Sequence, residues 1–171
     1  MTMIRLETPG DIAAIRAVND QAFGGPAEGT LVDALRREGL VIASLVAEDN
    51  AAVVGHILFS RVFIHSDSAK VRAVALAPMA VVPARQRSGI GSTLVRAGLD
   101  RCRTLGEQIV LVVGHPTYYP RFGFSHALTR ALQSPYDGEA FMALELVPGA
   151  LADVSGEVRY SSPFAAVESG P

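Results

Sequence analysis

The junction at residues 79–94 constrains the fold most, because a strand-like apolar run passes there through Pro83 and a polar turn into a long helical pattern. Gln86, Gly89 and Gly91 give the turn the spacing Gln-x-x-Gly-x-Gly. The first N–H groups of a helix lack partners within it and carry the positive end of its dipole, so they attract anions. Glycines there let a phosphate approach the backbone without meeting a Cβ atom. The spacing favours an anion-binding helix start, although an ordinary turn with two glycines has the same pattern.

Composition limits the classes of protein to consider. The chain has 171 residues, 49% of them hydrophobic and 19% charged, which is typical of one folded domain with its own core. The net charge of −2 offers no broad basic face for nucleic acid, so we expect no nucleic-acid partner. No apolar run reaches the roughly 18–20 residues that span a bilayer, and the N-terminus lacks a secretory hydrophobic segment. We therefore expect a cytoplasmic protein without a membrane partner.

The single cysteine, Cys102, excludes an internal disulfide and a cysteine-based metal cluster, and we expect no bound metal. It falls on the apolar side of a helical pattern, together with Leu94 and Leu99. This position favours a buried small hydrophobic residue, with a reactive thiol as the alternative.

Hydrophobic periodicity divides the chain into short elements, and Asp49-Asn50 predicts the turn of an antiparallel hairpin. The expected strands are 4–6, 40–48, 52–64, 71–82, 107–113 and 140–146, with a further edge strand at 157–160. The expected helices are 12–23, 28–38 and one that begins at Ser88 or Gly89 and ends at Leu105. We expect one α/β domain over residues 1–147, followed by a C-terminal extension at 148–171.

The strand at 107–113 follows strand 71–82 through a helix, and this order predicts a parallel crossover. Its run of five apolar residues, 109–113, is typical of a strand buried on both faces. Pro78 in the preceding strand cannot donate a ladder hydrogen bond, so it marks an edge, a bulge or an opening of the sheet.

Two histidines lie in or next to the expected hairpin. His56 sits among apolar residues inside a strand, where we expect a packed side chain with one hydrogen bond. The run His65-Ser66-Asp67 has the residue types of a catalytic triad, but triad members are brought together by the fold and not by adjacency. We expect a polar loop there.

The junction resembles the acyl-CoA-binding signature of the GCN5-related N-acetyltransferases (GNAT), in which a strand ending in Val-x-Pro precedes (Gln/Arg)-x-x-Gly-x-(Gly/Ala). The resemblance implies a mixed, mostly antiparallel central sheet flanked by helices, with splayed fourth and fifth strands. It also implies acetyl-CoA as co-substrate, with its pyrophosphate on N–H groups of residues 87–92 and its pantetheine arm along residues 79–81. The cofactor-binding residues implied are Met79, Ala80, Val81, Gln86, Arg87, Ser88, Gly89, Ile90, Gly91 and Ser92.

A second match is Tyr119 with Gly123-Phe124, which has the family's Tyr-x-x-x-Gly-Phe spacing. The resemblance implies that Tyr119 is the general acid toward the departing CoA thiolate. Reference pKa values of roughly 10 for tyrosine and 8.5 for a thiol make proton transfer feasible but not obligatory. An aromatic core position is the alternative for Tyr119, and Tyr118 is its rival for the catalytic role.

The chain departs from the family pattern ahead of this tyrosine, where Gly114-His115-Pro116 replaces the usual Asn and Ala. The apolar run 109–113 of the expected strand 107–113 contains no glutamate, and some members carry their general base on this strand. His115 is the nearest candidate base, because histidine has an unperturbed pKa of roughly 6.5. A structural histidine that caps the turn, or a water molecule held by main-chain carbonyls, is the alternative.

The resemblance covers residues 4–146 and implies transfer of an acetyl group to a primary amine of a small molecule or protein. The acceptor would bind near the variable loop at residues 23–28, where Glu28 is expected to interact with the helix dipole, with substrate binding as the alternative. A dinucleotide-dependent oxidoreductase is disfavoured, since its Gly-rich turn should follow the first strand of repeated βαβ units. A non-catalytic acyl-CoA sensor and a homodimer both stay open.

Overall fold

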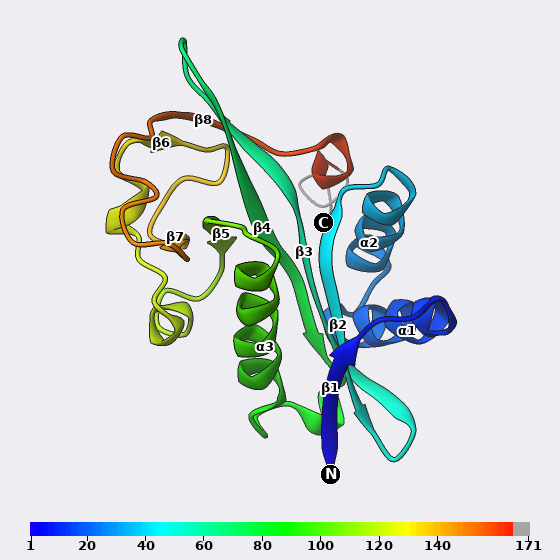
Figure 1. Ribbon diagram of the computed structural model, residues 1–171. Helices are drawn as coiled ribbons and strands as arrows, with labels where there is room; N and C mark the ends of the chain where they lie inside the picture. The colour runs from blue at the N-terminus through cyan, green and yellow to red at the C-terminus, as the bar shows by residue number, and fades with distance from the viewer. Residues whose placement is uncertain (166–171) are drawn as a thin grey trace.

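The computed structural model describes residues 1–165, which form a mixed sheet between two layers of helices (Figure 1). The main strand order is β1-β2-β3-β4-β5-β7, and every adjacent pair is antiparallel except β4 and β5, which are parallel. The strands are β1 (Thr2–Leu6), β2 (Val41–Asp49), β3 (Ala52–His65), β4 (Lys70–Val81), β5 (Ile109–Val113) and β7 (Phe141–Glu145). The expected α/β class, the hairpin and the parallel crossover are confirmed.

Three helices cover the two faces of the sheet. In Figure 1, α1 (Ile12–Phe23) and α2 (Ala27–Arg37) lie on one side of the sheet and α3 (Ile90–Thr104) lies on the other. A Cβ atom on Gly98 would lie 2.2 Å from the Phe59 ring, so α3 packs directly on β3 at this glycine. Cys102 is fully buried in the same layer, and burial raises the pKa of its thiol to about 12, as expected for a structural cysteine.

The C-terminal part of the described chain returns to the sheet. Strand β8 (Gly156–Arg159) pairs antiparallel with the end of β3 and parallel with the short β6 (Leu132–Gln133). Gly156 has φ +131°, and a Cβ atom there would lie 2.0 Å from the His65 carbonyl oxygen. The close crossing therefore requires glycine. Short 3-10 turns complete the fold: η1 (Pro9–Asp11), η2 (Pro83–Arg85), η3 (Tyr119–Phe122), η4 (Ala127–Thr129) and η5 (Ser162–Phe164).

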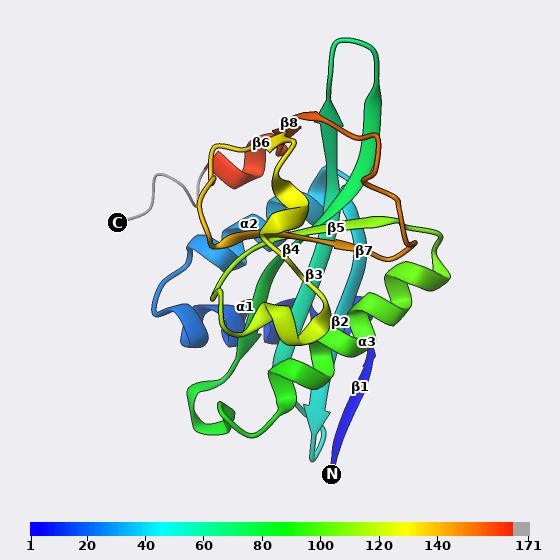
Figure 2. The same cartoon turned by 90° about the vertical axis from the view of Figure 1, so that its left-hand side faces the viewer.

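Strands β4 and β5 form only two residue pairs, Val74 with Val110 and Ala75 with Leu111, and then separate. Figure 2 shows β5 and β7 crossing the direction of β3 and β4. At the separation Ala77 and Pro78 together oppose Leu58 of β3, which makes a bulge in β4. The expected splay of the two strands and the special role of Pro78 are both confirmed.

A buried ion pair fastens the closed end of this opening. Arg61 of β3 donates 2.8 and 2.5 Å hydrogen bonds to the Glu107 carboxylate, just before β5. The same guanidinium donates to the Ala73 carbonyl of β4 at 3.1 Å. The Glu107 side chain thus belongs to this ion pair and precedes the strand. Strand β5 begins at Ile109, two residues after the expected start at residue 107.

The start of α3 also differs from the expectation. The helix begins at Ile90, because Arg87 (φ +62°) and Gly89 (φ +91°) have left-handed conformations that a right-handed helix cannot include. Glycine adopts this conformation without a steric penalty, which fits Gly89 to the position before the helix. The shift leaves a longer exposed turn between β4 and α3 than the periodicity predicted.

Candidate active site

A cavity of about 1020 Å³ fills the opening between β4 and β5. It extends from the turn before α3, along β4, to the connection between α1 and α2. Its lining includes backbone and side chains from residues 75–81, 85–87, 89, 91–92, 111–115 and 118–119. The two sequence motifs thus meet in one space.

The β4 wall consists of Met79, Ala80 and Val81. These residues pair with β3 on one side, while β4 has no pairing with β5 beyond Ala75. Buried backbone N–H and C=O groups need hydrogen-bond partners, so an extended ligand in the opening can bind this edge as an added strand would.

The turn before α3 presents backbone donors to the cavity. No side chain caps the helix, whose N-cap residue is Gly89, and both Gly91 and Ser92 line the cavity. A Cβ atom on Gly91 would lie 3.2 Å from Met79 Cε and 3.5 Å from the Tyr118 hydroxyl oxygen, so the glycine keeps this approach open. Uncapped N–H groups at a helix start are suited to bind an anionic group.

The remaining polar residues of the turn have different tasks. Gln86 donates from Nε2 to the Val81 carbonyl at 2.9 Å, and therefore ties the turn to the end of β4. Arg85 forms an ion pair with Asp49, whereas Arg87 is exposed at the cavity and has no ion pair among residues 1–165. Ser88 and Ile90 are the two expected cofactor residues outside the cavity lining. Ser88 donates to the Arg85 carbonyl and the Ile90 side chain is buried.

Tyr119 lies at the cavity with its ring in the core. The residue is only 8% exposed, and its ring packs edge-on against Tyr118 and Phe124, with centroids 5.1 and 5.7 Å away. Burial raises the pKa of Tyr119 to about 12, so the hydroxyl stays protonated and can donate. The expected alternatives, core aromatic and catalytic donor, are compatible in this position.

Gly114 makes room for Tyr119, a role that the sequence analysis missed. A Cβ atom at residue 114 would lie 2.3 Å from Tyr119 Cε2. Only the close spacing of a glycine and a later aromatic residue signals such a contact, and that signal is too common to be specific.

Tyr118 differs from its neighbour in how its hydroxyl is used. The Tyr118 oxygen lies 3.0 Å from Ser92 Oγ on α3, and the Arg121 guanidinium lies 4.6 Å from the centre of the ring. The hydroxyl of Tyr119 has no hydrogen-bond partner within the described residues. Of the two tyrosines, Tyr119 therefore has the hydroxyl that is available to a ligand.

His115 lies at the cavity with an exposed side chain. Its carbonyl accepts hydrogen bonds from the backbone N–H groups of Tyr118 at 3.0 Å and Tyr119 at 3.3 Å. The main chain of His115 thus orients both tyrosines, while no hydrogen bond to its imidazole is present in residues 1–165. The imidazole therefore lies beside the cavity and in contact with solvent.

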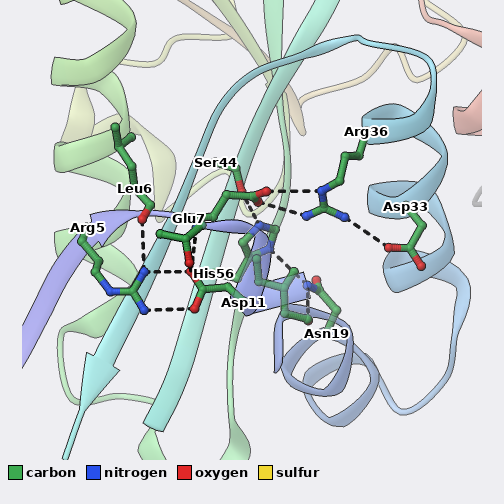
Figure 3. A network of polar contacts seen from close by, with 11 residues as sticks. Arg5, Leu6, Glu7, Asp11, Asn19, Asp33, Arg36, Ser44 and His56 are labelled. Atoms are coloured by element: carbon green, nitrogen blue, oxygen red, sulfur yellow. Dashed lines mark hydrogen bonds and ion pairs between the residues drawn. The ribbon is translucent and has the colours of Figure 1, made fainter. Parts of the chain in front are cut away.

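His56 lies apart from the cavity, in the buried polar network of Figure 3. Its Nδ1 atom is 3.1 Å from Asn19 Nδ2 and its Nε2 atom is 2.9 Å from Ser44 Oγ. It thus makes two hydrogen bonds, not the one expected. Ser44 donates to Glu7, which also accepts two bonds from Arg36. Burial, and then the charge of Arg36, lowers the pKa of His56 to about 3.

Residues 1–165 contain no group of three or more His, Cys, Asp or Glu side chains that could hold a metal ion. The helices of the same region are too short or too polar to cross a bilayer.

Comparisons with known sequences agree with the geometry. A family model described as acetyltransferase (GNAT) domain matches residues 3–127. Two Escherichia coli proteins named as uncharacterized N-acetyltransferases, YhbS and YjhQ, are each 34% identical to this chain. The YhbS match spans 165 residues, or 95% of this chain and 98% of YhbS. The YjhQ match spans 160 residues, or 90% of this chain and 88% of YjhQ.

Solved structures give the same result. The E. coli YhbS structure in complex with CoA has a TM-score of 0.88 and 34% identity, over 96% of this chain and 92% of that one. A GNAT acetyltransferase from Brucella melitensis in complex with acetyl-CoA has a TM-score of 0.80 and 37% identity, over 96% of this chain and 98% of that one.

Proposed function

Because the chain belongs to the GNAT acetyltransferase family, we propose that it transfers an acetyl group from acetyl-CoA to a primary amine in the cavity between β4 and β5. The observation that carries this proposal is the separation of β4 from β5 next to the uncapped start of α3. The two similar structures that contain CoA and acetyl-CoA support it. We also propose that the protein acts in the cytoplasm, where acetyl-CoA is available.

The residues around the opening fit a long phosphorylated cofactor. The N–H groups of residues 90–92 would bind the pyrophosphate, with Arg87 as an exposed cation nearby. The free edge of residues 79–81 would bind the pantetheine arm. Bound in this way, acetyl-CoA supplies the activated thioester. The protein's main contribution would be to hold this thioester close to the acceptor amine.

Tyr119 would assist the departing thiolate as a hydrogen-bond donor. With a pKa of about 12, its hydroxyl is a weaker acid than a thiol with a reference pKa of about 8.5. Complete proton transfer is therefore unfavourable at equilibrium, while donation to a charge that develops in the transition state is favourable. This refines the general-acid role implied by the family motif.

His115 would accept the proton that the acceptor ammonium must lose before it attacks. Its exposed imidazole lies at the same cavity and can pass a proton to solvent.

Acetyl-CoA binding and CoA release measured with a panel of primary amines, aminoacyl compounds and peptides test the proposal. We expect binding of acetyl-CoA and amine-dependent release of CoA. A tertiary amine such as triethylamine is the control and should give no release above background hydrolysis. A protein that does not bind acetyl-CoA would contradict the whole proposal. One that binds it but acetylates no amine would be a sensor.

A further inference from the structure

The cavity has two ends of different chemistry. Near α3 it is lined by Arg85, Arg87 and the uncapped start of the helix. At the α1–α2 connection it is lined by Glu28, the only carboxylate among the described residues of the lining. An anionic cofactor is attracted to the first end and a cation to the second.

Glu28 has no counter-ion within the chain that the structure describes. It is half-buried and lies in the first turn of α2, where the helix dipole favours a negative charge. No hydrogen bond or ion pair of its carboxylate occurs in residues 1–165. By contrast, Asp33 on the same helix pairs with both Arg16 and Arg36. The carboxylate of Glu28 is therefore available to a cationic ligand.

The surroundings of Glu28 at this end are apolar and largely aromatic. The side chains come from α1, α2 and three separate segments near the C-terminus, and they are Phe23, Leu31, Tyr136, Tyr160 and Phe164. The rings of Tyr136 and Tyr160 pack edge-on at 4.9 Å, and Phe164 follows at 5.3 Å from Tyr160. Phe23 is 45% exposed, so its ring can contact a ligand. Aromatic faces bind both apolar groups and organic cations.

We propose that the acceptor is a primary amine joined by a short chain to an apolar or aromatic group, with no carboxylate beside the amine. This inference rests on the proposed acetyl transfer and names the substrate class of the same cavity. Glu28 binds the ammonium form and determines specificity. A free amino acid would bring its carboxylate next to Glu28, where like charges repel. Simple amines and the N-terminal residue of a peptide have the same favourable chemistry.

Three probes separate these contributions: 2-phenylethylamine, phenylalaninamide and phenylalanine. They share the aromatic ring and the amine, and differ in having hydrogen, a neutral amide or a carboxylate on the carbon that bears the amine. Phenylalaninamide represents a peptide N-terminus. Binding to the CoA-saturated protein is measured by calorimetry at pH 6.5, where most of each amine is protonated, and CoA release from acetyl-CoA is measured in parallel.

We expect 2-phenylethylamine to bind at least tenfold more tightly than phenylalanine. Glu28→Gln should weaken 2-phenylethylamine binding at least tenfold, raise the KM for the amine, and leave the KM for acetyl-CoA unchanged. Glu38→Gln removes the same charge at the exposed end of α2, outside the cavity lining, and should change neither value. Phe23→Ala should weaken 2-phenylethylamine more than butylamine, which lacks the ring. Phenylalaninamide as good as 2-phenylethylamine would favour a peptide acceptor, and a much poorer one would favour a small amine.

Equal binding of 2-phenylethylamine and phenylalanine would overturn the inference. So would a folded Glu28→Gln variant with unchanged amine affinity, or no binding of any of the three probes. The binding titration does not depend on turnover. Glu28-dependent amine binding without CoA release would therefore contradict the proposed function alone, whereas turnover of other amines without dependence on Glu28 would contradict the inference alone.

Discussion

The network around His56 and the cavity around Tyr119 and His115 contain similar side chains in opposite environments. In the network, a fully buried histidine has a hydrogen-bond partner on each ring nitrogen. In the cavity, the imidazole of His115 and the hydroxyl of Tyr119 have no such partner among residues 1–165. His56 with Ser44 and Glu7 has the residue types of a catalytic group, but it is buried away from the cavity. It is therefore a weaker candidate for catalysis than His115 or Tyr119.

The difference shows how the protein divides its polar groups between stability and function. The network joins Asn19 on α1 and Arg36 on α2 to the sheet through Ser44 and His56. It holds both helices over the sheet, and so positions the α1–α2 connection that bounds the cavity (Figure 3). The polar side chains of the network are used mainly in contacts within the protein, whereas the His115 imidazole and the Tyr119 hydroxyl stay available at the cavity.

The largest expected effect tests the cavity side of this comparison. Tyr119→Phe keeps the ring and its packing but removes the hydroxyl. Turnover should fall by ~10²–10³-fold with nearly unchanged acetyl-CoA affinity, because the hydroxyl donates to charge that develops in the transition state. Steady-state kinetics and calorimetry measure the two quantities.

Tyr118→Phe is the matched control for this change, and it should lose much less activity because its hydroxyl contacts Ser92. A larger loss for Tyr118→Phe would mean that the two tyrosines have been assigned in the wrong order. No loss in either variant would exclude a tyrosine donor.

The next effect tests the network side. His56→Ala removes one hydrogen bond from each of the buried side chains Asn19 and Ser44 and opens a cavity. The free energy of unfolding should fall by about 3 kcal/mol. Urea denaturation measures it, and His115→Ala, at an exposed site, should stay within about 0.5 kcal/mol of the original protein. Equal losses in both variants would remove the distinction between the two regions.

A smaller effect concerns pH. The pKa of His56 is about 3 in the folded protein and roughly 6.5 when unfolded, so below pH 6.5 the unfolded chain binds a proton that the folded chain does not. The contribution of His56 to the free energy of unfolding is therefore present above the unfolded pKa of roughly 6.5 and is lost progressively as pH falls toward 3. Between pH 7 and 4.5 the loss from this group should be about 2.5 kcal/mol. Urea titrations at several pH values test it, and His56→Gln should flatten the dependence over this range.

The smallest effect separates ligand binding from stability within the cavity. Gly91→Val should weaken CoA binding more than tenfold, or over ~1.4 kcal/mol, because a side chain would occupy the approach to the α3 start. Gly91→Ala should cause a smaller loss. Calorimetric titration of folded variants measures both, and unchanged affinity for Gly91→Val would contradict the anion-binding role.

The sequence predicted those features that depend on local pattern. Alternating and continuous apolar runs identified the hairpin and β5, and Pro78 marked the place where the sheet opens. The start of α3 was less accurate, since the left-handed conformation of Arg87 has no sequence signal. The aromatic end of the cavity was missed, because Tyr136, Tyr160 and Phe164 come together only through the tertiary fold.

The ion pair between Arg61 and Glu107 has a mechanical consequence. Only two residue pairs join β4 to β5, so the sheet has two parts, β1–β4 and β5 with β7, that are connected over a short distance. Arg61 stabilises this connection, because its guanidinium donates hydrogen bonds to both Glu107 and the Ala73 carbonyl. We therefore expect this short, buried ion pair to limit how far β4 and β5 separate along the cavity. Arg61 and Glu107 do not line the cavity, yet we expect them to influence the affinity for a ligand bound between β4 and β5.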